Sequence, residues 1–367
     1  MKIRTWRYFD FWLLGAVAVL TIFGIAMINS AIAGNEDLAE RVPRQMIYAG
    51  LGFIVLLITA AIDYRYWKSI GRWLYIFVAA LLAFIYLTGG AELGGAARWI
   101  DIGLIYIQPS ELAKISMILM LADFFAKNRH RLQEISWIAR SLLITLGMVI
   151  WILLQPNLST SIVLLVIWFA LLWAAGLSLK HLLIMAAIGL LLPIVSFPFL
   201  HQYQQLRIIN FLFPDPTARH GANYNVTQAL ITIGNGGWLG QGYGQGSQVQ
   251  LRFLKVRHTD FIFSAIAEEF GFVGALLIIV LITFVVLRCL RIARLAPDTY
   301  GALISYGVAT LISFHMIVNI GMNLKLMPST GLPLPFISSG GSSLLSLLLG
   351  VGLVESVALR QKILGFD

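Results

Sequence analysis

The 367-residue sequence contains few charged residues and one cysteine. Asp, Glu, Lys and Arg make up 12% of it, whereas hydrophobic residues make up 59%. A soluble domain carries about 25% charged residues, because its surface must face water. The scarcity of charge therefore excludes an ordinary water-soluble enzyme, and a single cysteine, Cys289, excludes an internal disulfide. We expect Cys289 to pack as a small apolar side chain.

Several familiar signals are also missing. Gly240, Gly242, Gly244 and Gly246 do not have the spacing of a dinucleotide-binding fingerprint, so we expect a flexible turn there and no organic cofactor. His, Cys and carboxylate residues do not cluster with zinc-binding spacing. The sequence lacks a short cleavable leader, because the apolar run after Asp10 is long enough to span a bilayer. We therefore expect the N-terminus to be retained.

What the sequence does contain is a series of apolar runs. Runs of roughly 17 to 25 residues match the thickness of a bilayer when they form helices. The predicted fold is an all-α polytopic membrane protein, a single membrane domain over residues 1–367 with about ten transmembrane helices. The predicted spans are 10–31, 45–62, 70–88, 109–126, 137–154, 158–175, 181–199, 260–287, 300–322 and 338–359.

The basic residues predict the orientation of these spans. The formal net charge is +9, but in a membrane protein the distribution of Lys and Arg between the two sides matters more than the total. Alternate connections are rich in Lys and Arg, whereas the short connections between them hold only Arg41, Arg44, Arg98 and Lys325. The positive-inside rule then places both termini in the cytoplasm. We expect no nucleic-acid partner.

One connection, residues 200–259 between the seventh and eighth spans, is long and polar. The orientation places it outside the cell, and a connection of this length is usually functional or disordered. Val226, Ala229, Leu230 and Ile233 recur at helical spacing. We expect an amphipathic helix on the membrane surface in this part of the loop.

Ionisable residues inside apolar runs are costly and so are candidates for function. Here they are Glu111, Lys114, Asp260, Glu268, Glu269, His315 and Glu355. Glu111 and Lys114 stand three residues apart and share one face of a predicted helix. They can form a pair that only locks helix packing, or Lys114 can also offer positive charge to an anionic group.

Asp260 lies where the long loop meets the eighth span, after Arg257 and His258. A carboxylate at this place can cap the helix, and it can also act in catalysis. Small residues at 264, 267, 271 and 274 follow on roughly its face, so we expect Asp260 to point inward. His258 can orient the acid or bind phosphate, or it can be an ordinary loop histidine.

Two further patterns flank the predicted outer boundary, one deeper in the eighth span and one before the last span. Glu268 and Glu269 lie about two turns beyond Asp260, so a structural or tuning role is as plausible for them as a direct one. The run from Met327 to Ser343 is rich in Pro, Gly and Ser and precedes the last span. It is either a simple helix stop and cap, or an anion site built from free backbone amides. The candidate residues of that anion site are Ser338, Gly340, Gly341 and Ser342.

With these residues together, the sequence resembles the SEDS family (shape, elongation, division, sporulation) over nearly its whole length. The resemblance rests on 94–100, 108–114, 257–263 with 267–269, and 331–343. Within the family it resembles the RodA-like elongation branch more than the FtsW-like division branch, because of residues 327–331. Two departures are Ala97 beside Arg98, where the family usually has paired arginines, and Ser339, where it usually has tyrosine.

The resemblance implies a peptidoglycan glycosyltransferase that polymerises lipid II into glycan strands and releases undecaprenyl pyrophosphate. Asp260 is then the general base that takes the proton of the acceptor hydroxyl. The leaving pyrophosphate needs positive charge, for which Lys114, Arg98 and Arg257 are the candidates, together with the backbone near Gly340. A divalent cation, Mg²⁺ or Mn²⁺, held with Asp260 is a further expectation.

The resemblance also implies partners and a location. The expected partners are lipid II and a lipid-linked glycan strand, a class B penicillin-binding protein, other elongation-complex proteins and membrane lipids. The expected location is the bacterial cytoplasmic membrane, with the active site on the extracytoplasmic side. A flippase for lipid-linked precursors is the main alternative, and a scaffold that only recruits other enzymes is another. The placement of Asp260, Glu111 and Lys114 near the outer boundary favours chemistry there over transport.

Overall fold

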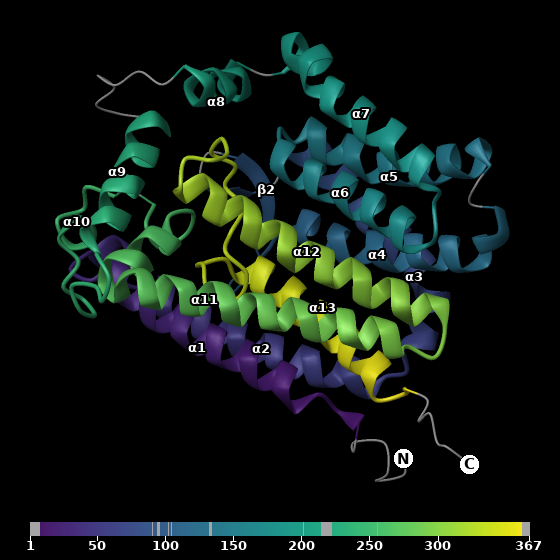
Figure 1. The fold of residues 1–367 in the computed structure, drawn as a ribbon, viewed down its shortest axis with the longest axis horizontal. Coiled ribbons are helices and arrows are strands. Elements are labelled where there is room, and N and C mark those ends of the chain that lie inside the picture. Colours follow the sequence, from purple (N-terminus) through teal and green to yellow (C-terminus); the bar gives the residue numbers. More distant parts are fainter. Residues whose placement is uncertain are drawn as a thin grey trace.

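The computed structural model shows a mostly helical bundle. It describes residues 8–361 except 90, 94, 95, 102, 104, 132, 133, 201, 214–221 and 255. The long helices are α1 (Phe11–Ile32), α2 (Arg41–Ala61), α3 (Tyr64–Thr88), α4 (Pro109–Lys127), α5 (Ile135–Leu154), α6 (Leu158–Ala174), α7 (Leu179–Ser196), α11 (Ile262–Leu295), α12 (Thr299–Asn323) and α13 (Gly341–Ala358). Figure 1 shows them running roughly along the long axis of the molecule, with α12 and α13 in the middle.

Each predicted apolar run overlaps one of these helices. Seven helices, α1, α2, α3, α5, α11, α12 and α13, are long and apolar enough to cross a bilayer. α6 and α7 contain shorter apolar stretches, and α4 carries several charged side chains. The chain is therefore a multi-pass membrane protein. The number of spans, ten, and the cytoplasmic side of the termini stay predictions.

The all-α prediction needs one correction, because residues 91–107 contain a small antiparallel sheet. Its strands are β1 (Ala91–Leu93), β2 (Ala96–Asp101) and β3 (Tyr106–Ile107), in the order β1-β2-β3. Gly89 ends α3 in the left-handed conformation, and Pro109 occupies the first turn of α4. The connection between these two fixed ends is short. Its strands satisfy their backbone N–H and C=O groups by pairing with one another.

The long connection, residues 200–259, contains helices α8 (Gln202–Leu212), α9 (Ala222–Asn235) and α10 (Ser247–Gln250). A helix thus forms where helical spacing predicted one, and its placement on a membrane surface stays a prediction. Ala229 of α9 is fully buried in a small cluster with Leu254, Phe261 and Met322. The apolar face of α9 is therefore used at least partly against the protein itself.

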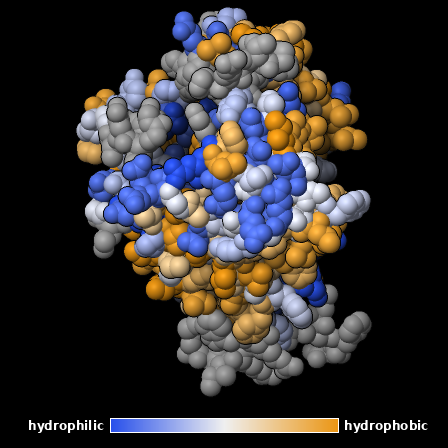
Figure 2. Space-filling view, turned by 90° about the vertical axis from the view of Figure 1, so that its left-hand side faces the viewer, coloured by the Kyte–Doolittle hydropathy of each residue, from blue (hydrophilic) through white to orange (hydrophobic). Residues whose placement is uncertain are grey.

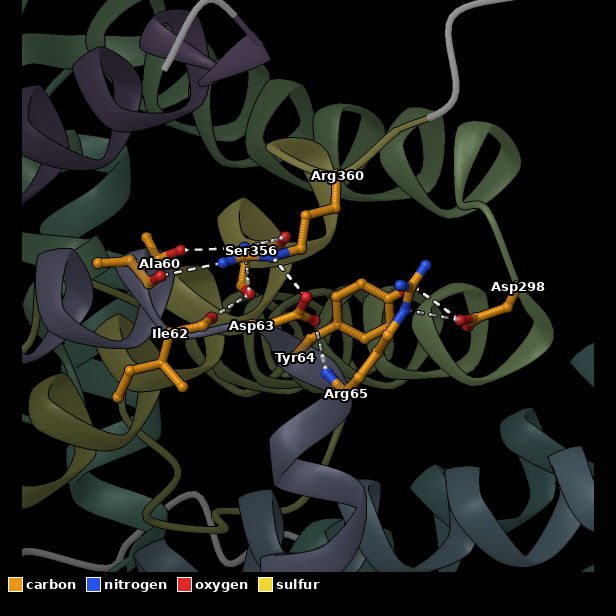
Figure 3. Close-up of polar contacts among 9 residues, drawn as sticks. Ala60, Ile62, Asp63, Tyr64, Arg65, Asp298, Ser356 and Arg360 are labelled. Atoms are coloured by element: carbon orange, nitrogen blue, oxygen red, sulfur yellow. Dashed lines mark hydrogen bonds and ion pairs between the residues drawn. The ribbon is translucent and has the colours of Figure 1, made fainter. Parts of the chain in front are cut away.

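Helix ends at one extremity of the bundle are joined by a polar cluster (Figure 3). Arg360 donates to the carbonyl groups of Ala60 and Ala61 and lies 3.1 Å from an oxygen of Asp63. The Tyr64 hydroxyl donates to Asp298 at 2.7 Å. These contacts join the α2–α3 turn to the start of α12 and the end of α13. The last carbonyl groups of α2 need donors, which Arg360 supplies. We call this extremity, which contains Asp63, Tyr64, Asp298 and Arg360, the staple end.

The opposite extremity carries α9, α10 and the start of α11, at the left of Figure 1. Seen from that side, Figure 2 shows a hydrophilic band across the molecule with hydrophobic side chains around it. This pattern is typical of a membrane protein whose polar end meets water. We call it the loop end, and it contains Asp260.

Candidate active site

Asp260 lies in the turn that precedes α11. The helix begins after Phe261. Among the described residues no backbone amide of its first turn donates to the Asp260 carboxylate, and the Ser264 amide donates to Asn323 instead, so the carboxylate does not cap the helix. An oxygen of that carboxylate instead lies 3.9 Å from the position that a Cβ atom on Gly331 would occupy. Gly331 has φ +74°, a conformation that glycine adopts without strain. The acid thus faces the segment between α12 and α13.

The environment of Asp260 favours its neutral form more than water does. Burial raises the pKa of Asp260 to about 6, while the positive charge of Arg207 and a hydrogen bond from Thr259 oppose that rise. Close by, burial and the charges of Arg41 and Arg257 lower the pKa of His258 to about 4. At neutral pH the turn therefore presents a carboxylate that accepts a proton readily, beside a neutral imidazole.

Two buried asparagines of α12 hold the Asp260 turn. The side-chain amides of Asn319 and Asn323 both donate to the Asp260 carbonyl, at 3.1 and 3.0 Å. Asn319 also donates to the carbonyl of Leu332 at 2.8 Å, and Asn323 accepts from the Ser264 amide and hydroxyl. Because both asparagines are fully buried, these bonds are shielded from water. They join the Asp260 turn, the first turn of α11 and the segment at Leu332.

The segment that leads into α13 is also fastened to this turn. Ser338 donates its hydroxyl proton to the Thr259 carbonyl at 2.7 Å, and the Ser339 amide donates to the His258 carbonyl at 2.9 Å. The Gly340 amide faces an oxygen of Gln45 at 3.3 Å. Several donors of the predicted anion site are thus engaged within the protein. Its use by a substrate stays a prediction.

Gly341 and Ser342 connect α13 to its neighbours. A Cβ atom on Gly341 would lie 2.2 Å from the ring of Tyr48, so only glycine lets the two helices approach this closely. Ser342 donates to the Tyr106 carbonyl at 2.7 Å and accepts from the Gln108 amide at 3.0 Å. Ser342 therefore fixes the start of α4, the helix that carries the second charged group of the site.

That second group is the pair Glu111 and Lys114. The Lys114 ammonium nitrogen lies 2.7 Å from an oxygen of Glu111, and both side chains are buried. The same nitrogen lies 3.4 Å from Nε2 of His315 on α12, whose Nδ1 lies 3.4 Å from the Pro333 carbonyl. A buried ion pair of this kind is costly to form and costly to break. The predicted pair is therefore present, with a histidine contact that the sequence did not indicate.

Asp260 and the Glu111–Lys114 pair are linked through one segment of chain. Among the described residues they make no direct contact with each other. Asp260 lies against Gly331, and Lys114 reaches His315, which faces Pro333 two residues further on. Residues 331–333 therefore contact Asp260 directly and Lys114 through His315. α12 carries contacts of both groups, through Asn319 and Asn323 to the Asp260 turn and through His315 to Lys114. A joint role of Asp260 and Lys114 stays a prediction.

Two of the predicted cationic residues, Arg257 and Arg98, donate hydrogen bonds to backbone carbonyl groups. Arg257 is buried and donates through Nε to the carbonyl of Ala31 at the end of α1. Arg98 on β2 donates to the Pro156 carbonyl at 2.8 Å, between α5 and α6. A role for either one in binding a pyrophosphate stays a prediction. Their observed contacts fasten the loop and the small sheet to the bundle.

Glu268 and Glu269 hold the loop that crosses α11. Glu268 accepts from the backbone amides of Gln248 and Val249, at 2.9 and 3.1 Å, and so caps the short helix α10. Glu269 accepts from the hydroxyl of Ser30 on α1. Both carboxylates are buried with these partners. Their contacts are those of structural residues.

The glycine-rich run is not the simple flexible turn expected from the sequence. α11 is broken at Gly271, which has φ +67°, and the carbonyl groups of Glu268 and Glu269 accept from the amides of Gln241 and Gly242. Gly240 packs so closely that a Cβ atom there would lie 2.2 Å from the Glu269 carbonyl oxygen. The glycines thus let one backbone cross another at the break.

The residues at Asp260 do not form a protein-held metal site. In the part of the chain that the structure describes, no group of three His, Cys, Asp or Glu side chains is arranged to bind a metal. Divalent cations such as Mg²⁺ prefer several oxygen ligands, and Asp260 offers a single carboxylate. A divalent cation stays a prediction, and no chemical step is assigned to it.

The sequence patterns do not indicate three contributors to this region, Asn319, Asn323 and Arg207, and they indicate His315 only as an ionisable residue within an apolar run. Two asparagines four residues apart near the end of a span are a signal that helical spacing could have revealed. Arg207 gave no such signal, because its effect on Asp260 depends on how α8 folds back.

Comparison with known proteins now places the chain. The model of the cell cycle protein family FtsW/RodA/SpoVE matches residues 7–363. The chain belongs to the SEDS family. Among SEDS relatives, a probable peptidoglycan glycosyltransferase FtsW of Hydrogenovibrio crunogenus is 36% identical over 379 residues, covering 99% of this chain and 96% of the relative. The peptidoglycan glycosyltransferase MrdB of Escherichia coli K12 is 34% identical, covering 94% and 92%.

Solved SEDS structures have the same fold. A chain of a peptidoglycan synthase complex, described as coordinating polymerization and crosslinking, superposes with a TM-score of 0.82 at 32% identity, covering 97% of this chain and 99% of that one. The rod shape determining protein RodA of Thermus thermophilus superposes with a TM-score of 0.70 at 31% identity, covering 95% and 96%. The resemblance drawn from the sequence is thereby confirmed at the level of the family.

Proposed function

We propose that this protein is a peptidoglycan glycosyltransferase that polymerises lipid II on the extracytoplasmic face of the bacterial cytoplasmic membrane. The observation that carries the proposal is the Asp260 carboxylate, which is not used as a helix cap and has a pKa of about 6. A base with a pKa slightly below neutral is ionised in most molecules and still takes a proton effectively. The names of its SEDS relatives support the same reaction class.

In this mechanism Asp260 removes the proton from the acceptor GlcNAc 4-hydroxyl as that oxygen attacks the anomeric carbon of the donor MurNAc. The bond from this carbon to the lipid pyrophosphate breaks, and the pyrophosphate leaves as an anion. It needs no general acid, unlike the alkoxide leaving group of a glycoside hydrolase. An attack from the side opposite the leaving group inverts the configuration, from an alpha-linked donor to a beta-linked strand.

Positive charge must then stabilise the leaving pyrophosphate. Lys114 is the first candidate, because its ammonium group is held in place by Glu111 and His315 before substrate binds. Arg207 is a second, since its charge already acts on Asp260. A preorganised cation stabilises developing negative charge without the cost of reorganising water.

The proposal includes partners and a branch of the family. The synthase complex among the structural relatives supports a class B penicillin-binding protein as partner. Other elongation-complex proteins and membrane lipids are further partners that we propose from the family resemblance alone. We assign the chain to the elongation branch on residues 327–331, although relatives with both branch names match it. Cells depleted of their elongation enzyme should therefore regain rod shape with this protein, and cells depleted of their division enzyme should not divide with it.

The deciding experiment is polymerisation of lipid II by the purified chain. We expect Asp260→Asn to lower the rate at least about 100-fold, because general-base catalysis contributes on that order. Asp37→Asn is the matched control, since Asp37 is an acidic residue outside the site, in the connection between α1 and α2, and should keep the wild-type rate. Both proteins must elute as folded monomers or complexes identical to wild type.

The flippase alternative makes the opposite prediction. If the protein only moves lipid-linked precursors, purified wild-type protein forms no glycan polymer, with or without the penicillin-binding protein, and Asp260→Asn changes nothing in that assay. Substantial polymer from folded Asp260→Asn protein would equally remove the role given to Asp260.

A further inference from the structure

A cavity of about 300 Å³ lies at the staple end, far from Asp260. It is lined by Lys68, Ser69, Arg72 and Trp73 of α3 and by Lys127 of α4. α3 begins at Tyr64, whose hydroxyl bonds to Asp298 at the start of α12, whereas Asp260 is held by the far end of the same helix. The positive-inside pattern predicts that this end faces the cytoplasm.

The cavity has an excess of positive charge. Lys127 lies 2.6 Å and Lys68 lies 3.8 Å from the two oxygens of Asp123, one turn before Lys127 on α4. Lys68 also lies 5.8 Å from the centre of the Tyr300 ring. Arg72 forms no ion pair among the described residues. Three cations facing one carboxylate leave about two positive charges for a ligand.

The surroundings of the cavity indicate what kind of anion it takes. Trp73 lines the cavity and is 70% exposed, a placement typical of tryptophan at the boundary between headgroups and acyl chains. Ile70, Phe77 and Phe84 are also exposed, and with Trp73 they follow one face of α3. This apolar stripe leads from the cavity along the length of α3. A free phosphate would use only the cations, whereas a phospholipid would use both.

We propose that this cavity binds the headgroup of an anionic phospholipid of the inner leaflet, with its acyl chains along the exposed stripe of α3. Basic pockets between transmembrane helices on the cytoplasmic side are suited to such headgroups. The site is independent of Asp260 and of the proposed reaction. It gives the enzyme a preference for anionic membrane regions at the end opposite its chemistry.

The test uses the full-length protein, delipidated in detergent and titrated with phosphatidylglycerol or phosphatidylcholine by native mass spectrometry. We expect wild-type protein to prefer phosphatidylglycerol, and each of Arg72→Gln and Lys127→Gln to weaken that binding about fivefold. Arg140→Gln is the matched control. It removes an exposed charge of α5 that lies over Trp137 and does not line the cavity, so binding should stay unchanged.

A second measurement locates the acyl chains. Brominated phosphatidylglycerol should quench tryptophan fluorescence of wild-type protein more than that of Trp73→Phe. Equal affinity for the two lipids, or unchanged phosphatidylglycerol binding in both charge variants, overturns the proposal. Displacement of the lipid by millimolar inorganic phosphate also overturns it, because the site would then be one for a soluble anion.

Discussion

At the scale of single residues, the pKa of Asp260 makes the proposed activity depend on pH. A base acts only when ionised, so we expect kcat/KM to fall about tenfold per pH unit below about pH 6, the pKa of Asp260. The measurement is polymerisation rate between pH 5 and 8, with the unfolding temperature recorded at each pH. A rate that stays level down to pH 5 in folded protein would contradict the assignment.

The same shift has a consequence for stability. Because burial raises the folded-state pKa of Asp260 above its ordinary value, the folded protein binds this proton more tightly than the unfolded chain does. The contribution of Asp260 to stability therefore decreases as pH rises from about 4 to about 6. We expect Asp260→Asn, which cannot ionise, to have an unfolding temperature at neutral pH equal to or above that of wild type.

Asn319 should position Asp260 without touching substrate. Asn319→Asp replaces the amide donor by an acceptor, so the carbonyl groups of Asp260 and Leu332 both lose a partner. We expect kcat to fall at least about tenfold with little change in KM, because a displaced base loses its reaction geometry. The limb of the pH profile near 6 should also move, which a loss of stability alone would not cause.

Ser264→Ala is the control for this prediction. It removes a hydroxyl that donates a hydrogen bond to Asn323. The hydrogen bonds from the side-chain amides of Asn319 and Asn323 to the Asp260 carbonyl stay in place. We expect it to lower stability by about 1 kcal/mol and to keep the wild-type kcat. Equal losses of kcat in the two variants would show that packing around the asparagines, rather than donation to Asp260, is what matters.

At the scale of elements, the break in α11 depends on the loop that crosses it. Gly240→Ala adds a methyl group 2.2 Å from the Glu269 carbonyl oxygen, whereas Gly244→Ala adds one with no atom within 4 Å. Both glycines have positive φ, at +83° and +71°, so the conformational cost is similar. We expect Gly240→Ala to be less stable than Gly244→Ala by at least about 2 kcal/mol, because its clash is with backbone.

Thermal unfolding in one detergent provides this comparison. If the two variants had the same unfolding temperature, the crossing of the two segments could relax without loss of stability.

The elements themselves were well predicted: every apolar run overlaps a helix, because length and hydropathy are properties of the run alone. The sheet at 91–107 was not predicted, because its pairing depends on how α3 and α4 fix the two ends of that connection.

At the scale of the whole molecule, the described ends of the chain lie together. The Asp10 amide donates to Glu355 on α13 at 2.9 Å, and the Arg288 guanidinium pairs with the Asp10 carboxylate. The beginning of α1, the end of α11 and the end of α13 are thus joined at one extremity. This agrees with an even number of crossings, and the side of the membrane remains to be measured.

Cysteine labelling of intact cells measures that side. Leu239→Cys, at an 81% exposed position of the loop end, should react with a membrane-impermeant maleimide. Arg129→Cys, between α4 and α5, should react only after the cells are opened. The background is low, because Cys289 is buried. Labelling of position 129, and not of 239, from outside would invert the predicted orientation and move Asp260 to the wrong side for the proposed reaction.

The sequence by itself determined the membrane class, the helices and the family, because composition, run length and local motifs do not depend on distant contacts. It also indicated Asp260 and the Glu111–Lys114 pair, since helical spacing and the cost of buried charge can be judged locally. Only the tertiary structure decided that Asp260 does not cap α11, that Asn319 and Asn323 hold its turn, and that His315 meets Lys114. These contacts join residues far apart in the chain, so their partners exist only once α12 has packed between α4 and α11.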